Sequence, residues 1–179
     1  MSKVFINSTN LNQSKQELES QIIEILKTST DNLNFIRKGD SVLIKPALNS
    51  PDPYPSTTHP LAVKVVAQEL LKKGAKVIIG DQSGIEHVVH TAEGLKKGSS
   101  IENFKKTGIY DACKDLDVKW VAFEQDGWNK GFIHESQPKA TSWPNGFWIT
   151  KWVKDVDHII NLPRISTSLF QFGNDTEMW

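Results

Sequence analysis

The sequence contains a single cysteine, Cys113, and this scarcity excludes several classes of protein. One thiol cannot form a disulfide within the chain, and it cannot hold an iron–sulfur cluster, which needs several cysteine ligands. Cys113 lies in the helix-like segment "IYDACKDL". We interpret it as a small buried residue, because a nucleophilic cysteine would need a neighbouring base and a lowered pKa.

The chain also lacks an excess of charge and long apolar runs. Lysine and arginine together number 21, as do aspartate and glutamate, so no overall basic field attracts nucleic acid and we expect no such partner. No apolar run approaches the length of a membrane span, and the N-terminal "MSKVFINSTN" has no signal-peptide core. We therefore expect no membrane partner and a cytoplasmic location.

Apolar segments alternate along the chain in a way that predicts an α/β fold, with a mostly parallel sheet flanked by helices. "SVLIK" (41–45) and "AKVIIG" (75–80) are short strand-like runs, and residues 60–73 between them have helical spacing. Gly74 is suited to end that helix. Such a strand–helix–strand unit almost always lies in a parallel sheet. We predict a single α/β domain over residues 1–179, within the size range of one domain.

Similar patterns predict the remaining elements. We expect strands at 3–7, at 118–123 and within 147–163, and helices at 13–29, 100–108 and 108–117. Asn12 is a candidate cap for the first helix. Residues 124–135 have the composition of a turn or hairpin, and the Trp-rich part from Trp143 to Trp152 is expected to pack on the domain as a small sub-element.

The loop "KPALNSPDPYPSTTHP" follows the strand that ends at Lys45. Three prolines between 51 and 55 restrict the backbone and favour one preset shape. Thr57 or Thr58 can cap the following helix, and Pro60 suits its first turn. The loop is either one wall of a ligand site or only a rigid connector.

Charged and polar residues in three loops suit a small anion. Lys45, Arg164 and the free amides of a helix start are groups that bind carboxylate or phosphate, and His59 can transfer a proton or bind a metal. In "GDQSG", Asp81 can hold a metal, orient Lys45 or bind a hydroxyl, although the segment also reads as an ordinary turn. It lacks the G-x-G-x-x-G nucleotide fingerprint.

These loops follow three predicted strands, and ligands of open parallel sheets bind beyond the carboxyl ends of the strands. If the strands are neighbours, "KPALNSPDPYPSTTHP", "GDQSG" and "NLPRIST" line one crevice. The candidate catalytic residues are His59 and Asp81. The candidate ligand-binding residues are Lys45, Asn49, Thr58, Ser83, Gly84 and Arg164. We assign no set of metal ligands.

Two further segments allow alternative interpretations. "EHVVH" places His87 and His90 one turn apart if helical, either as half of a metal site or as two surface histidines. Trp143, Trp148 and Trp152 either form a satellite hydrophobic cluster or stack on a sugar or base.

The quoted segments resemble the family catalogued as domain of unknown function 362. Its pattern is "KPN" after a strand, "TTHP" at a helix start, a "GD-x-SG" loop and a later "D-x-I-I-N-x-P-K-x-K-T-H" segment, and the likeness runs from Phe35 to Thr167. The matching positions are Lys45, Pro46, Thr58, His59, Pro60, Asp81, Ser83, Gly84, Asn161, Pro163 and Thr167. Many members carry ferredoxin-like iron–sulfur segments, so the resemblance also implies an iron–sulfur redox partner, although no cluster is expected in this chain.

The chain departs from this pattern at several positions. Ala47 replaces the asparagine of "KPN", with Asn49 two residues on, while Ser166 replaces a lysine and Ser168 the histidine. A one-base frameshift after Thr167 would allow the tail 168–179 to encode a family-like "H-x-x-x-x-G-M-T-L-K-C-G". We therefore expect the domain to be incomplete at its C-terminal end, through a frameshift or as a genuine short variant.

Three hypotheses about function follow. In the first, the chain binds or transforms a small anionic metabolite in the strand-end crevice. In the second, it is an accessory or electron-transfer module that docks to an iron–sulfur partner. In the third, it is a non-catalytic fragment with an exposed sheet edge. The sequence leaves open whether it is an enzyme and which cofactor it uses.

Overall fold

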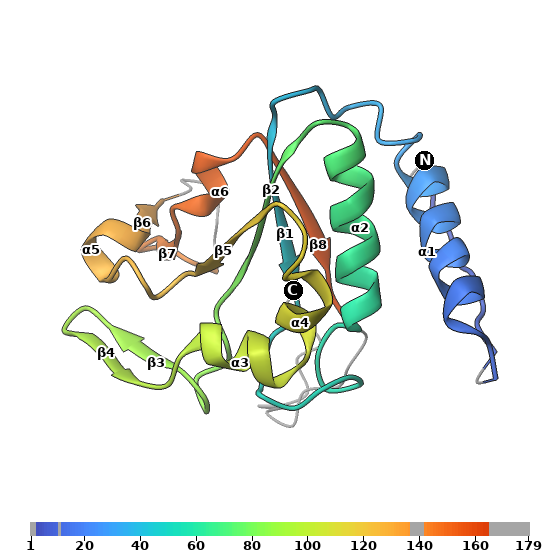
Figure 1. Ribbon diagram of the computed structural model, residues 1–179. Helices are drawn as coiled ribbons and strands as arrows, with labels where there is room; N and C mark the ends of the chain where they lie inside the picture. The colour runs from blue at the N-terminus through green and yellow to red at the C-terminus, as the bar shows by residue number, and fades with distance from the viewer. Residues whose placement is uncertain (1–2, 11, 137–141, 165–179) are drawn as a thin grey trace.

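The computed structural model describes residues 3–10, 12–136 and 142–164, and its centre is a four-stranded sheet (Figure 1). The strand order is β5-β2-β1-β8, and every neighbouring pair is parallel. The four strands are β1 (Ser41–Pro46), β2 (Lys76–Asp81), β5 (Val118–Ala122) and β8 (His158–Leu162). This arrangement confirms the predicted α/β fold with a mostly parallel sheet.

Four helices belong to one face of this sheet. They are α1 (Lys15–Ser29), α2 (Pro60–Lys72), α3 (Ser100–Lys106) and α4 (Ile109–Cys113). Helix α2 connects β1 to β2 and packs against α1, which lies at the outside in Figure 1. Strand side chains that alternate toward this face, such as Val42, Ile44 and Ile79, are fully buried. The larger of the two apolar clusters lies here.

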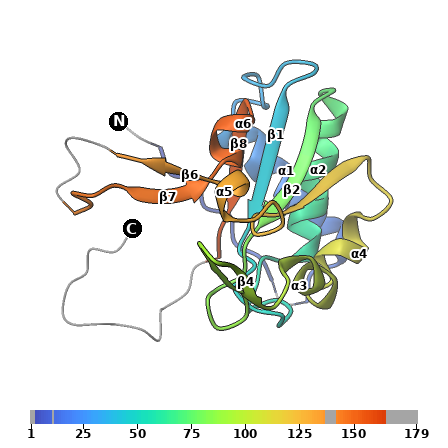
Figure 2. The same ribbon diagram turned by 90° about the vertical axis from the view of Figure 1, so that its left-hand side faces the viewer.

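The smaller cluster lies on the opposite face, where Leu43, Ile78, Val121 and Phe123 are buried. Its cover is a sub-element made of α5 (Trp128–Gly131), β6 (Phe132–Glu135), β7 (Phe147–Thr150) and α6 (Trp152–Asp155). In Figure 2 its strands β6 and β7 project to the left of the sheet, while α2 lies on the right. The expected Trp-rich sub-element is therefore present. Strand β6 pairs antiparallel with β7, and it comes from residues 124–135, which were expected to form a turn or hairpin.

The predicted strand at 3–7 was wrong. Residues 3–10 form no strand, and the side chains of Val4 and Ile6 are 83% and 90% exposed. Their composition favours a strand, but a strand also needs backbone hydrogen bonds to a neighbour. No described strand of the sheet lies beside them.

The first helix begins later than expected. Its cap is Ser14 and not Asn12, because Ser14 and Glu17 form a reciprocal capping box. The predicted stop at Gly74 is confirmed, since its φ of +79° is a conformation that favours glycine.

The pair His87 and His90 does not lie on a helix, so that expectation was also wrong. His90 belongs to β3 (Val89–Thr91), which pairs with β4 (Gly94–Lys97) in a small hairpin. The two β-branched valines between these histidines, Val88 and Val89, favour a strand over a helix.

The order of the strands fixes where loops can meet. From β1 the chain proceeds outward to β2 and then β5, whereas β8 returns to the other side of β1. The direction of winding therefore reverses between β1 and β8. In open parallel sheets the carboxyl side of such a reversal is where a crevice forms.

Candidate functional site

The three predicted loops follow neighbouring strands. Strand β1 lies between β2 and β8, and its register sets Lys45 beside Asn161 and Pro46 beside Leu162. The loop between β1 and α2 lies below the sheet in Figure 1, at the carboxyl ends of β1 and β8. The condition for a shared crevice at this edge is therefore met.

Lys45 and Asp81 form an ion pair across β1 and β2. The Nζ of Lys45 lies 3.0 Å from one oxygen of Asp81, and the other oxygen accepts a 3.0 Å hydrogen bond from the backbone N–H of Leu48. Burial raises the pKa of Asp81, while Lys45 and the backbone donors oppose that rise. The Lys45 side chain is 42% exposed and that of Asp81 only 5%. Asp81 therefore orients Lys45 and fixes the start of the loop, and the ammonium faces outward.

Thr58 joins the loop to β8, and the prediction that it or Thr57 caps α2 was wrong. Its hydroxyl accepts from the N–H of Ala47 at 2.8 Å and donates to the carbonyl of Leu162 at 2.6 Å. Thr57 donates instead to the carbonyl of Asp52. With both hydroxyl functions engaged, Thr58 ties the β1–α2 loop to β8 and has no hydrogen left to donate to a ligand.

His59 is the residue that caps α2, and Pro60 follows it at the first helical position, as predicted. The Nδ1 of His59 accepts a 3.1 Å hydrogen bond from the N–H of Leu61. Burial lowers the pKa of His59, so the ring is neutral near pH 7 and its proton is on Nε2. The free edge of this imidazole is therefore a hydrogen-bond donor, and its one proton-accepting nitrogen is occupied by the helix.

The second loop is attached to the first through the backbone. The N–H of Gly84 donates to the carbonyl of Asn49 at 3.0 Å, and a Cβ added at Gly84 would lie 3.1 Å from that oxygen. Ser83 is buried, and its hydroxyl accepts from the side chain of Asn103 at 2.9 Å. The structure thus brings Asn49 and Gly84 together as wall contacts and turns Ser83 inward.

Sequence reasoning missed the buried polar network behind this loop. Ser100 accepts from the N–H of Ser83 at 2.9 Å and donates to Glu124 at 3.1 Å, and Glu124 also accepts from the N–H of Ser100 at 2.7 Å. Both residues are buried. They are 24 positions apart in segments without a motif, so no local signal identifies the pair.

Arg164 lies two residues beyond β8. Its Nε is buried and has no hydrogen-bond partner among the described residues. Its position just past the carboxyl end of β8 puts Arg164 at the same edge of the sheet as Lys45 and the start of α2. Thr167, Ser166, Ser168 and the tail 168–179 lie outside the described residues, so the expectations about them stay predictions.

Other candidate groups lie away from this edge. The ring of His90 packs against Trp128 and Phe132, with centroids 5.8 and 5.4 Å away, inside an aromatic cluster that also contains Trp148. Across the ranges 3–10, 12–136 and 142–164, no three His, Cys, Asp or Glu side chains are grouped to hold a metal ion. Cys113 is buried, and burial raises its pKa to about 11, which agrees with our interpretation of this residue.

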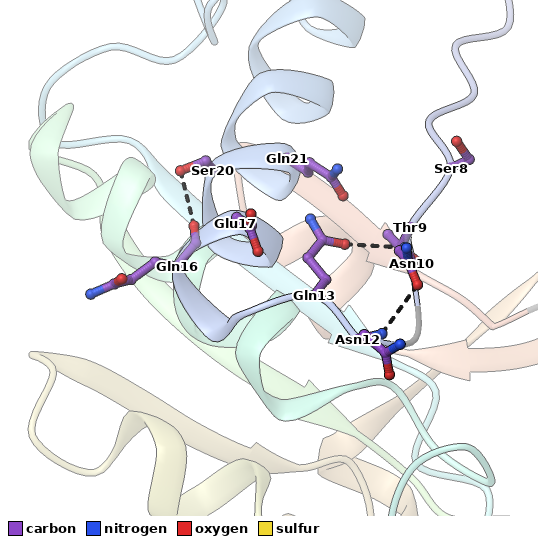
Figure 3. A pocket seen from close by; sticks show the side chains of 9 residues that line it. All are labelled: Ser8, Thr9, Asn10, Asn12, Gln13, Gln16, Glu17, Ser20 and Gln21. Atoms are coloured by element: carbon purple, nitrogen blue, oxygen red, sulfur yellow. Dashed lines mark hydrogen bonds between the residues drawn. The ribbon is translucent and has the colours of Figure 1, made fainter.

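One hollow among the described residues is a different feature. It has a volume of about 960 Å³ and lies between the N-terminal segment and α1 (Figure 3). Its lining is serine, threonine, asparagine, glutamine and one ionisable residue, Glu17, whose carboxylate is engaged in the capping box. It offers no charged group for an anion and no free acid or base, so we do not assign it as the site.

No helix in the described part of the chain has the length and apolar character needed to cross a membrane. Neither the curated proteins nor the solved structures include a match to this chain.

One family model does match, and it spans the elements whose loops meet at the carboxyl edge of the sheet. The match runs over residues 42–170, from the first sheet strand past β8, close to the range expected from the sequence motifs. It contains Lys45, Thr58, His59, Asp81 and Arg164. The chain therefore belongs to the family described as Domain of unknown function (DUF362).

Proposed function

We propose that this chain binds a small anionic metabolite in the crevice at the carboxyl ends of β1, β2 and β8. One observation carries the proposal: Lys45, whose side chain is 42% exposed, lies where the sheet winding reverses, and the nearly buried Asp81 holds its ammonium at 3.0 Å. A buried carboxylate is a costly way to stabilise a fold, so the placement of Asp81 at the carboxyl edge of the sheet favours a functional role.

The other groups of the edge support binding more than catalysis. His59 offers a donor at Nε2, and Arg164 adds a permanent positive charge. A proton-transfer step would need a free acceptor, but the Nδ1 of His59 caps α2 and both oxygens of Asp81 are engaged. We therefore infer a binding function, in which His59 and Asp81 orient the site.

Thermal unfolding in the presence of an acidic-metabolite panel tests the proposal. The panel contains carboxylates and phosphate esters, and the variants are Lys45→Met and, as a matched control, Lys76→Met at the opposite end of the sheet. We expect at least one panel member to raise the melting temperature of the wild type and of Lys76→Met but not of Lys45→Met. Equal stabilisation of all three proteins would overturn the proposal. If no anion acts on any of them, the iron–sulfur accessory hypothesis becomes the better one.

A further inference from the structure

The charge of the crevice indicates which class of anion fits it. Lys45 and Arg164 contribute two positive charges, and Asp81 and the buried Glu124, which lies two residues beyond β5, contribute two negative charges, so the total is zero. Asp52, the other charged residue of the β1–α2 loop, is exposed to solvent and can only reduce that total. A monoanion would leave one negative charge uncompensated at this edge. A dianion would leave two beside the buried carboxylates, and its larger desolvation cost would add to this.

The register of β1 and β8 supplies a second donor next to Lys45. Lys45 pairs with Asn161, and neighbouring strands lie about 4.8 Å apart. Side chains alternate along a strand, so Lys45 and Asn161 point to the same face as Leu43, which is the face of the sub-element. Both side chains are accessible, and the amide of Asn161 makes no hydrogen bond to another described residue.

The two donors suit the two oxygens of one carboxylate. The ammonium of Lys45 uses one hydrogen on Asp81 and keeps others for a ligand, while the Asn161 amide can donate two. An ammonium and an amide on adjacent strands can each donate to one oxygen of a planar group. A tetrahedral phosphate has a further charged oxygen for which this pair has no donor.

We propose that the crevice selects a monocarboxylate over a phosphate ester, and that Asn161 is the second ligand-binding side chain beside Lys45. This inference rests on the proposed function, because it names the ligand class of the same crevice.

Titration by NMR with two simple probes tests it. The probes are propionate, a monoanion, and methyl phosphate, which is mainly a dianion at about pH 8, at equal ionic strength. We expect propionate to shift signals at the carboxyl edge and to bind at least about fivefold more tightly than methyl phosphate.

Two variants at Asn161 test the second contact. Asn161→Ala should weaken propionate binding about two- to tenfold, which is the loss of one hydrogen bond, and Asn161→Asp should abolish it by repulsion. The matched control is Asn129→Ala, an exposed asparagine on α5, which should change nothing. Asn161 is exposed, so neither change should prevent folding, and circular dichroism verifies that.

The outcomes separate this inference from the function on which it rests. If methyl phosphate binds as tightly as propionate and Lys45→Met abolishes its binding, the inferred selectivity for carboxylates is wrong, but the proposal of an anion site at Lys45 still holds. If propionate needs Lys45 but binds Asn161→Ala unchanged, the assignment of Asn161 is wrong. If neither probe binds the wild type at the carboxyl edge, both proposals fail.

Discussion

The two ends of the same sheet carry similar polar pairs in different surroundings. At the amino end, Asp40 and His158 lie 3.1 Å apart with side chains 20% and 28% exposed, and Asp157 accepts hydrogen bonds from Ser41. At the carboxyl end, Asp81 is only 5% exposed as it pairs with Lys45. Each end thus ties β1 to a neighbouring strand, but only the carboxyl end buries its carboxylate.

Only the carboxyl end of the sheet pays the desolvation cost of a buried carboxylate, and packing of the strands does not require that burial. Solvated contacts such as those of Asp157 contribute little and cost little. Buried ones must be hydrogen-bonded to be tolerated, and the side chains of Thr58, Ser83 and Asp81 each have at least one partner. The carboxyl end is therefore held by buried hydrogen-bonded polar groups, whereas the polar groups of the amino end are solvated. Three sets of variants test this difference.

The largest effect is expected from Asp81→Ala. It removes the partner of Lys45 and leaves the buried N–H of Leu48 without an acceptor, which should cost about 3 kcal/mol of unfolding free energy. Asp157→Ala at the amino end should cost clearly less, because its solvated donors can turn to water. Urea unfolding followed by tryptophan fluorescence measures both. Equal losses would contradict the contrast between the two ends.

A smaller effect is expected from Thr58→Val. Valine keeps the shape but leaves the N–H of Ala47 and the carbonyl of Leu162 without their partner, at a cost of about 2 kcal/mol. Ser41→Ala is the matched hydroxyl deletion at the exposed end and should cost about 0.5 kcal/mol. The same urea experiment compares them, and a larger loss in Ser41→Ala would contradict the conclusion that Thr58 joins the β1–α2 loop to β8 at the cost of a buried hydroxyl.

The smallest effect is a difference in pH dependence between two carboxylates. Hydrogen bonds from Ser41 lower the pKa of Asp157 below 3.8, so its stabilising contribution is present above about pH 4 and is lost as the pH falls through the folded-state pKa. Burial raises the pKa of Asp81 above 3.8, so the sign is opposite: the wild type gains stability relative to Asp81→Asn as the pH falls from neutral toward about 4.

Urea midpoints of the wild type, Asp157→Asn and Asp81→Asn between neutral pH and about pH 3.5 show these slopes. If both variants change in the same direction relative to the wild type, the two carboxylates do not differ as described.

Much of the fold could be predicted from the sequence because the sheet strands are short apolar runs with turn residues at their ends. The strands near Val42, Ile78 and Ile159 and the stop at Gly74 were found in this way. The strand at 3–7 could not be judged, since pairing depends on a neighbour elsewhere in the chain. The cap of α2 was missed because Thr57 and Thr58 precede His59 in the sequence, and threonine occurs more often than histidine as an N-cap residue.

The sequence predicted where the candidate site lies, but it did not predict which of its residues face a ligand and which hold the loops together. The motifs identified Lys45, Asp81 and Thr58 together, because residues at strand ends converge in a parallel sheet. Which of them face a ligand and which build the wall depends on hydrogen bonds between segments far apart, such as Thr58 to Leu162. The network of Ser100 and Glu124 depends on the same kind of long-range contact.

The most direct test of an anion site at the carboxyl end is a map of backbone amide shifts in the wild type during propionate titration. We expect the saturating changes to cluster at residues 46–49, 58–62 and 81–84, around the ammonium of Lys45. Saturating changes confined to the other end of the sheet, around Asp40, Ser41 and Asp157, or no saturating change at all, would contradict the placement of the site.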